Sequence, residues 1–275
     1  MNIARSSYYY KAAKPPGDDV LLVLRIEEIV EEFGRYGYRR VTAQLQRDGW
    51  AVNRKRVLRI MREHGWLCRV RRRSVRTTNS NHPYGVYPNL VGNLEVTGKN
   101  QVWVADITYI RLRLMFVYLA VILDLFSRRA IGYALSRRID TQLTLTALRM
   151  AIRNRQPGTG IIHHSDQGVQ YAAGEYVDEL HANGFRISMS RRGNPYDNAN
   201  AESFMKTLKS EEVELNDYQT EEDALERIPY FLEEVYNQKR LHSSLGYRPP
   251  VEFEELTEDG TNQPSCPLRL GRAVQ

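Results

Sequence analysis

The order of apolar segments after residue 98 is the feature that most constrains the fold. Three β-branched and aromatic runs follow one another with short turns between them: NQVWVADITYI, MFVYLAVILDLFS and RAIGYALS. Such runs are typical of strands in an antiparallel meander. Helical and strand-like segments then alternate, in the order TQLTLTALRMAIRNR, GIIHHSD, AAGEYVDELHANG, FRISMS and AESFMKTLKSEEV. The resulting order β-β-β-α-β-α-β-α predicts a mixed α/β domain.

Residues 20–76 show helical periodicity instead. The segment VLLVLRIEEIVEEFG predicts one helix that ends at Gly34. We expect Thr42 to cap a second, short helix, and Asn53 to cap a third that stops at Gly65. Two short helices joined by a glycine-containing turn are typical of a helix-turn-helix, in which the second helix enters the DNA major groove. A helical hairpin that only carries a basic surface is the alternative.

Positive charge is concentrated in this same region. The chain carries a net charge of +6, and residues 35–76 contain 14 Lys and Arg against 2 Asp and Glu. The rest of the chain is therefore acidic, and a basic module is attached to it. This local density is what neutralisation of DNA phosphates requires. The candidate DNA contacts are Arg54, Lys55, Arg56, Arg59, Arg62, Arg71, Arg72 and Arg73.

The composition excludes several other classes of protein. No run of about 18 apolar residues is present, so nothing predicts a membrane span, and the N-terminus lacks the apolar stretch of a signal peptide. Two cysteines, Cys68 and Cys266, are too few for a disulfide framework or a cysteine zinc site. A reducing, cytoplasmic setting is expected.

The C-terminal part is expected to be helical and then irregular. Thr220 and Asp223 predict a capping box before the helix EEDALERIPYFLEEVYNQ, in which Pro229 can cause a kink. Beyond Glu255 the turn-rich composition predicts a mobile tail. The predicted organisation is an N-terminal extension (1–19), a basic helix-turn-helix domain (20–76), a linker (77–97), an α/β catalytic domain (98–255) and a flexible tail (256–275).

Three carboxylates stand where a catalytic site needs them. Asp106 lies in the middle of an apolar strand, Asp166 ends another, and Glu202 opens a helix after a Gly/Asn/Pro loop. Three carboxylates suit a hard cation, magnesium or manganese. Two such ions, about 3.5–4 Å apart, can activate an attacking oxygen and stabilise a leaving oxygen at a phosphodiester. Each residue also has a structural alternative: an arginine pair for Asp106, a turn cap for Asp166 and a helix N-terminus for Glu202.

Polar residues around Glu202 extend this hypothesis. Lys209 lies seven residues after Glu202, and a heptad returns to within about 20° of the same helix face. Lys206, four residues after Glu202, lies on that side too. We expect both lysines to contact DNA phosphates, with solvent-exposed lysines as the alternative. Asp197 and Asn198 are expected to shape the loop before the helix rather than to bind metal.

Two histidines and one further aspartate need separate treatment. His163 and His164 are not accompanied by Cys or His residues at zinc-ligand spacing, which argues against zinc. We expect one of them to line the site or to hydrogen-bond to DNA, with His164 as the candidate. Asp124 lies in a strand near Arg128 and Arg129, and we expect structural pairing with one of these arginines, with a catalytic role as the alternative.

The spacing of the three carboxylates resembles a known family. Asp106 precedes Asp166 by 60 positions, and 35 residues separate Asp166 from Glu202. The surrounding segments HHSDQGVQY, GNPYDNANAESFMKTLKSE and YNQKRLHSSLGYRPPVEF resemble the integrase-core transposases of bacterial insertion sequences. The match is to the second-reading-frame proteins of the insertion-sequence-three family, relatives of retroviral integrases. It runs from about Tyr8 through Phe253.

The resemblance implies a fold and a reaction. The implied fold is a ribonuclease-H-like core, a mixed five-stranded sheet flanked by helices, behind a small all-α helix-turn-helix domain. The implied activity is that of a DDE transposase with Asp106, Asp166 and Glu202 as metal ligands, which cleaves strands at insertion-sequence ends and transfers them, through a circular intermediate.

The resemblance also implies partners and a location. The implied partners are terminal inverted repeats, target DNA, a dimer or higher oligomer, and a first-reading-frame protein or fusion. The implied location is the bacterial nucleoid. A catalytically inactive DNA-binding regulator and a simple metal-dependent nuclease are the rival functions.

Overall fold

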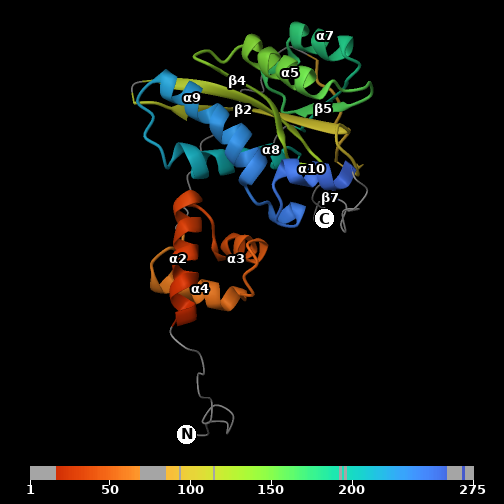
Figure 1. The fold of residues 1–275 in the computed structure, drawn as a ribbon. Helices are drawn as coiled ribbons and strands as arrows, with labels where there is room; N and C mark the ends of the chain where they lie inside the picture. The colour runs from red at the N-terminus through yellow and green to blue at the C-terminus, as the bar shows by residue number, and fades with distance from the viewer. Residues whose placement is uncertain are drawn as a thin grey trace, which may run out of the picture. The chain divides into compact units, whose positions relative to one another are not determined.

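The computed structural model describes residues 17–68, 85–92, 94–113, 115–191, 194, 197–258 and 268–269 (Figure 1). The chain divides into two compact units, Met1–Val70 and Arg71–Gln275. No helix in the described part of the chain is long and apolar enough to cross a membrane.

The first unit consists of three helices, α2 (Gly17–Glu32), α3 (Tyr38–Arg47) and α4 (Arg54–Glu63). Asn53 caps α4 as predicted, because its side chain accepts a 3.0 Å hydrogen bond from the backbone N–H of Arg56. One buried face of each helix contributes to a shared core. This core contains Leu22, Ile26, Ile29, Tyr36, Val41, Leu45, Val57, Ile60 and Met61.

Thr42 does not cap α3, contrary to the prediction. The helix begins earlier, at Tyr38, with Gly37 as its N-terminal flanking residue. Thr42 is buried inside the helix, and its hydroxyl donates a 2.7 Å hydrogen bond to the carbonyl of Tyr38. The preceding turn of the helix therefore satisfies this hydroxyl, and Thr42 is free to face the core.

The second unit is built on a five-stranded sheet with the order β4-β3-β2-β5-β6. Strands β2 (Val102–Arg111), β3 (Phe116–Asp124) and β4 (Ala130–Ser136) form the expected antiparallel meander. Strands β5 (Ile162–Ser165) and β6 (Arg186–Met189) continue the sheet beyond β2 in the parallel direction. β2 is therefore central, with an antiparallel neighbour on one side and a parallel neighbour on the other.

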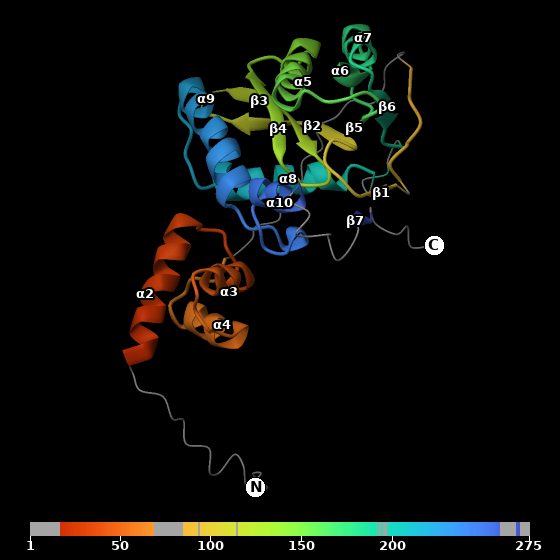
Figure 2. The same cartoon turned by 45° about the vertical axis from the view of Figure 1, so that its right-hand side comes forward.

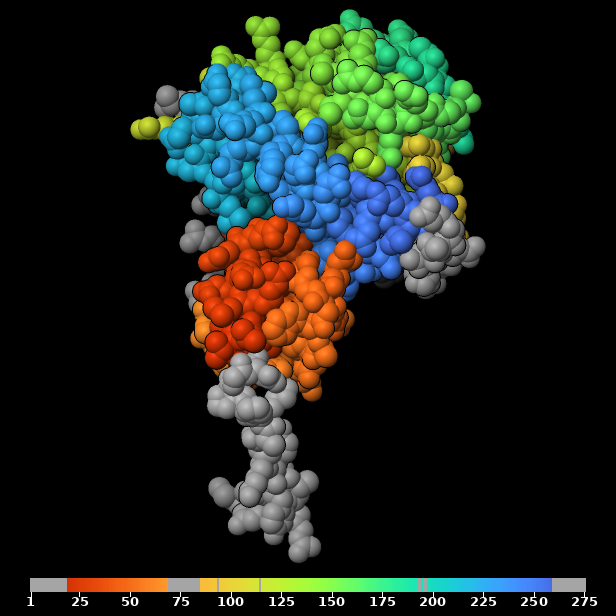
Figure 3. All heavy atoms as spheres, viewed as in Figure 1, coloured from red at the N-terminus to blue at the C-terminus, as the bar shows by residue number. Residues whose placement is uncertain are grey.

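Helices cover both faces of this sheet, which confirms the mixed five-stranded sheet with flanking helices (Figure 2). One face carries α5 (Thr141–Arg155), α6 (Val169–Ala172) and α7 (Gly174–Ala182). In the space-filling view, α9 and the segments that follow it form the outer layer over the sheet (Figure 3). The elements on that second face are α8 (Ala199–Leu208), the π-helix η1 (Lys209–Val213), α9 (Glu221–Tyr230), the π-helix η2 (Phe231–Lys239), the 3₁₀ turn η3 (Ser243–Leu245) and α10 (Pro250–Glu258).

The C-terminal part confirms one prediction and corrects another. The capping box of Thr220 and Asp223 is present, and Pro229 lies within α9 without ending it, since η2 continues the run. The tail was expected to lack structure beyond Glu255. Instead α10 continues to Glu258, and a short strand β7 (Leu268–Arg269) pairs with β1 (Glu95–Val96). Backbone pairing with a segment far away in the sequence leaves no local signal. The other residues of the predicted tail lie outside the described ones.

Asp124 has the structural role that was expected, but with a different partner. Its side chain is fully buried and accepts hydrogen bonds from the backbone N–H groups of Asn100 and Phe126, at 2.7 and 2.9 Å. The nearby guanidinium is that of Arg155, 3.9 Å away, and Arg155 also pairs with Glu254. The predicted pairing with a neighbouring arginine is therefore wrong, because a partner from helix α5 reaches the buried carboxylate.

Candidate catalytic site

Asp106 and Asp166 lie side by side because their strands are neighbours. Residues Val104 and His164 pair across the parallel strands β2 and β5. Two residues further along each strand, Asp106 and Asp166 reach the same place, and neighbouring strands are about 4.8 Å apart. Asp166 follows the last residue of β5, and its carboxylate accepts a 2.9 Å hydrogen bond from the backbone N–H of Gly168. The sheet topology thus brings two carboxylates together.

The environment of Asp106 disfavours its negative charge. Burial raises the pKa of Asp106 to about 8, and the charge of Asp166 adds to this rise. Glu202 acts in the same direction, whereas the backbone N–H of Ile107 and the Lys209 ammonium oppose it. The side chain nevertheless keeps partial solvent exposure. Asp106 is therefore a largely buried carboxylate beside a second one, and a cation would stabilise its charge.

Glu202 reaches this place from the other layer of the domain. It lies in the first turn of α8, and its carboxylate is 3.7 Å from the ammonium of Lys206, in an exposed pair. An adjacent side of α8 packs on the sheet through buried side chains. These side chains are Ala201, Phe204, Met205 and Leu208. Glu202 thus stands on a helix that is fixed by packing, while its carboxylate remains accessible.

Lys209 is directed toward Asp106, and Lys206 toward solvent. The Lys209 ammonium lies 4.5 Å from the centre of the Tyr109 ring, which is close enough for a cation–π interaction. Burial lowers the pKa of Lys209, and the charge of Asp106 partly offsets this effect. Lys206 is 80% exposed. Tyr109 was missed by the sequence analysis, since an aromatic residue in a strand gives no sign of what stacks on it.

The loop before α8 is anchored on both sides. Arg191 forms a 2.9 Å ion pair with Asp197 and holds the pKa of Asp197 down at about 2. The amide of Asn198 lies 3.5 Å from the carbonyl of Ala105, the residue before Asp106. These contacts agree with the expectation that the two residues shape the loop.

His164 does not have the predicted role in DNA contact. Its ring is fully buried, with Nδ1 2.8 Å from the Ser188 hydroxyl and Nε2 3.0 Å from the carbonyl of Asp197. Burial lowers the pKa of His164 to about 4, so the ring is neutral. His163 is also buried and lies 2.9 Å from the Tyr176 hydroxyl. Both histidines therefore belong to the core behind the site, because their side chains alternate between the two faces of a strand covered on both sides.

The basic residues of α4 fall into two groups. Arg54, Lys55 and Arg62 are exposed on the helix surface. Arg56 is half-buried and forms a 3.0 Å hydrogen bond with Asp19 of α2, so its guanidinium is paired within the three-helix unit, and its contact with DNA stays a prediction. Arg59 is exposed and pairs with Glu63 at 3.1 Å. The remaining candidates, Arg71, Arg72 and Arg73, lie outside the described residues.

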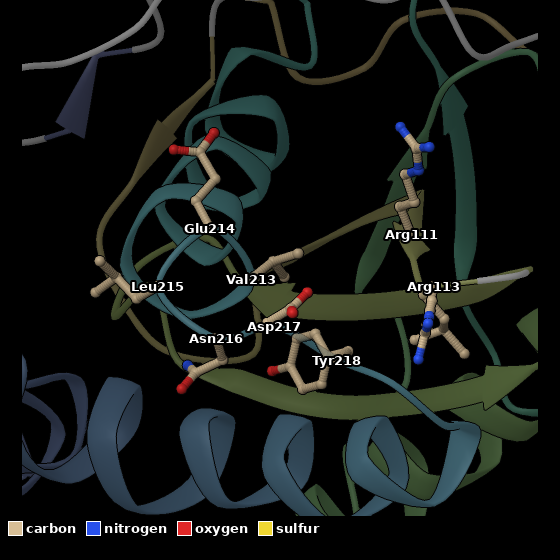
Figure 4. Close-up of a pocket in the computed structure, with 9 residues that line it drawn as sticks. Arg111, Arg113, Val213, Glu214, Leu215, Asn216, Asp217 and Tyr218 are labelled. Atoms are coloured by element: carbon tan, nitrogen blue, oxygen red, sulfur yellow. The ribbon is translucent and has the colours of Figure 1, made fainter.

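A polar hollow of about 510 Å³ opens beyond the end of β2. In Figure 4, Arg111 and Arg113 stand on one side of it and the loop after η1 on the other. Two carboxylates, Glu214 and Asp217, balance the two arginines, so the hollow lacks the excess positive charge that phosphate binding requires. We assign it no role in the reaction.

The comparisons with known proteins place this geometry in a family. Residues 96–195 and 183–250 match the integrase core domain, and residues 17–74 match an HTH-like domain. The insertion element IS600 31 kDa protein of Shigella sonnei is 39% identical over 92% of this chain and 95% of its own length. The transposase InsF for insertion sequence IS3A of Escherichia coli is 36% identical over 80% of this chain and 77% of its own. The chain belongs to the IS3-type transposases.

The fold agrees with this assignment. The simian T-cell lymphotropic virus intasome, solved in complex with a PP2A regulatory subunit, has a similar fold with a TM-score of 0.50 and 16% identity. The similarity covers 83% of this chain and 74% of that chain. The predicted family, the integrase-like fold and the activity class are confirmed: this transposase is a polynucleotidyl transferase that cleaves and transfers DNA strands.

Proposed function

We propose that Asp106, Asp166 and Glu202 are the catalytic carboxylates of this transposase and that together they hold two divalent cations, magnesium or manganese. The observation that carries the proposal is the convergence of three carboxylates and Lys209 from four separate elements, β2, the end of β5, α8 and η1. No packing requirement of the sheet explains why acidic side chains should meet there, since each would be more stable in water.

The donor set fits a hard cation. Among the described residues, no three His, Cys, Asp or Glu side chains are gathered tightly enough to hold an ion as they stand. Asp106 and Asp166 already share one place, and their mutual repulsion is what a cation would relieve. Glu202 becomes the third ligand if its side chain rotates away from Lys206 and toward the ion. The ion pair with Lys206 is exposed, so it can break at little cost. When bound, two divalent ions would activate the attacking oxygen and stabilise the leaving oxygen.

The proposed activity consists of two successive reactions, strand cleavage and strand joining. In the first, water attacks a phosphodiester at the transposon end, a new P–O bond forms, and the 3′-oxygen leaves as a hydroxyl. In the second, that 3′-hydroxyl gives up its proton and attacks another phosphodiester. A new P–O bond joins the two strands, and the bond to the 3′-oxygen of the attacked strand breaks, so that this oxygen leaves as a hydroxyl. Asp106, in β2, and Asp166, which follows β5, would hold the cations at one place on the sheet, and the reacting phosphate would bind to those cations. The Lys209 ammonium, held on Tyr109, supplies positive charge to a phosphate beside them.

The three-helix unit would bind the DNA ends. Arg54, Lys55 and Arg62 project from α4, the second helix of the helix-turn-helix, and are available to phosphates or base edges. Because two ends must be joined, we propose that the transposase works as a dimer or higher assembly on the inverted repeats and target DNA. A first-reading-frame protein, separate or fused, is the proposed additional partner.

The test is magnesium-dependent nicking and joining of labelled transposon-end DNA by the full chain. Wild-type protein is expected to yield nicked and joined products with magnesium and none with EDTA. Asp106→Asn is expected to yield neither. Asp178→Asn is the matched control, because Asp178 is exposed on α7, a helix on the opposite face of the sheet from α8.

The outcomes separate the rival functions. Equal cleavage by wild type and Asp106→Asn would show that the carboxylates are not catalytic. Binding to the ends without cleavage by any form would favour a DNA-binding regulator. Cleavage without joined product would favour a nuclease.

A further inference from the structure

The segment Tyr236–His242 contains buried polar side chains that the catalytic proposal leaves unused. Tyr236, Asn237, Arg240 and His242 are only 2–6% exposed. Burial of an arginine is unfavourable unless the guanidinium is paired. The contacts of these side chains therefore show what the segment is built to hold.

Arg240 clamps the junction between α8 and η1. Its Nε and Nη2 atoms lie 2.6 and 2.8 Å from the two carboxylate oxygens of Glu211, a two-pronged pair with fixed geometry. Nη2 also lies 3.4 Å from the hydroxyl of Thr207. Thr207 belongs to the last turn of α8 and Glu211 to η1, so Arg240 spans the point at which the α-helix becomes a π-helix. Lys209 is the first residue after this change.

Tyr236 holds the same helix nearer to its start. Its ring packs edge-on against Phe204, with centroids 4.9 Å apart, and also against His242, with the same centroid distance of 4.9 Å. Phe204 is the second residue after Glu202. Aromatic pairs of this geometry have a preferred orientation, unlike contacts between aliphatic side chains. The segment therefore fixes α8 at two points, one beside Glu202 and one around Lys209.

Asn237 ties the segment to the sheet. Its amide donates to the carbonyl of Ala130 and accepts from the N–H of Ala130, both at 2.9 Å. Ala130 begins β4, the edge strand of the sheet. The amide thus replaces the backbone of the strand that is missing at this edge. One short segment joins α8 and η1 to the sheet that carries Asp106.

We propose that Tyr236–His242, and Arg240 above all, is a positioning element that sets Glu202 and Lys209 against Asp106 and Asp166. This inference rests on the proposed function. Asp106 lies in β2 and Asp166 directly after β5, whereas Glu202 lies on a helix in the other layer, so the geometry of the three carboxylates depends on where α8 packs on the sheet. A buried ion pair adds little net stability compared with apolar packing, and what it does provide is orientation.

A second buried arginine–glutamate pair supplies the control. Arg155 and Glu254 are 9% and 3% exposed, compared with 4% and 13% for Arg240 and Glu211. Arg155 and Glu254 join α5 to α10, and neither lies in α8 or η1. Lysine in place of either arginine keeps the positive charge but cannot form the two-pronged hydrogen-bonded pair with the carboxylate. A purely structural role predicts the same behaviour for Arg240→Lys and Arg155→Lys.

The experiment measures metal binding and catalysis separately on the full chain. Calorimetric titration with Mn²⁺ gives the dissociation constant without DNA, and cleavage of end DNA gives the Mg²⁺ concentration for half-maximal rate. For Arg240→Lys we expect both values to rise about tenfold, the size of effect seen when the residues supporting metal ligands are changed. Arg155→Lys and Arg240→Lys are expected to lower the melting temperature by similar amounts. Arg155→Lys is expected to leave the Mn²⁺ dissociation constant and the half-maximal Mg²⁺ concentration unchanged.

Glu211→Gln provides a second variant if Arg240→Lys does not fold. It keeps one acceptor for the arginine and should raise both values by a smaller factor. Equal shifts in the Arg155 and Arg240 variants, or no shift in either, would overturn the positioning role while leaving the catalytic assignment intact. A wild-type chain that neither binds Mn²⁺ nor cleaves would instead refute the proposed function, and this inference with it.

Discussion

Replacement of Asp106 by asparagine is expected to stabilise the folded catalytic unit in the absence of metal, although it abolishes cleavage. In the folded protein the Asp106 pKa is raised from 3.8 to about 8 by burial and by the neighbouring Asp166. In the unfolded chain the same carboxyl ionises near its ordinary value. Between these two pKa values the folded state holds a proton that the unfolded state has lost, so wild-type stability falls as the pH rises.

The size of this effect follows from the pKa difference. Each pH unit in this window costs about 1.4 kcal/mol, so the upper limit at pH 7 is about 4 kcal/mol. Because Asp106 keeps partial exposure, water reduces the effect, and we expect about 2 kcal/mol. Asparagine has nearly the same shape and no charge. The variant should therefore match wild type at pH 4 and exceed its stability by about 2 kcal/mol at pH 7.

The assay is urea unfolding in EDTA at several pH values, read by hydrogen exchange of peptides from β2. This readout isolates the catalytic unit from the three-helix unit. Saturating Mg²⁺ is expected to stabilise wild type and to leave Asp106→Asn unchanged, which would reverse the order of stability. If both proteins show the same pH dependence in EDTA, burial and the charge of Asp166 do not raise the pKa of Asp106 in the folded protein.

Four further substitutions, one of them a control, test other parts of the structure. Lys209→Ala should reduce strand joining by about 10²-fold, because it removes a charge that is oriented beside Asp106. Lys206→Ala changes an exposed side chain and should reduce strand joining less than threefold, and product gels compare the two variants. Gly132→Ala places a methyl group 2.3 Å from the carbonyl of Ala147, so it should destabilise the catalytic unit by about 3 kcal/mol in urea unfolding. Asn53→Ala removes the cap of α4 and should cost the three-helix unit about 1 kcal/mol, seen as faster hydrogen exchange in α4 with unchanged exchange in β2. An unchanged exchange rate in α4 would count against that cap.

The local features of this protein were readable from its sequence. The cap at Asn53 and the capping box at Thr220 and Asp223 depend on side chains within three residues of the backbone groups that they satisfy. The alternation of strands and helices depends on apolar periodicity, which is also local. The interval between Asp166 and Glu202, together with the segments around them, carried the resemblance to the family, because both the interval and the segments can be read along the chain.

Only the tertiary structure decided what surrounds each polar side chain. His164 looked available beside Asp166, yet the parallel neighbour β6 and the loop before α8 bury it completely. Asp124 lies near an arginine of α5, and Arg56 hydrogen-bonds to an aspartate of α2. Hydrogen bonding, burial and charge pairing act through space between segments that are distant in sequence, so periodicity and spacing carry no record of them. For the same reason, nothing in the sequence indicated that Tyr236–His242 contacts α8 and η1, because this follows only from the pairing of Arg240 with Glu211 in the folded protein.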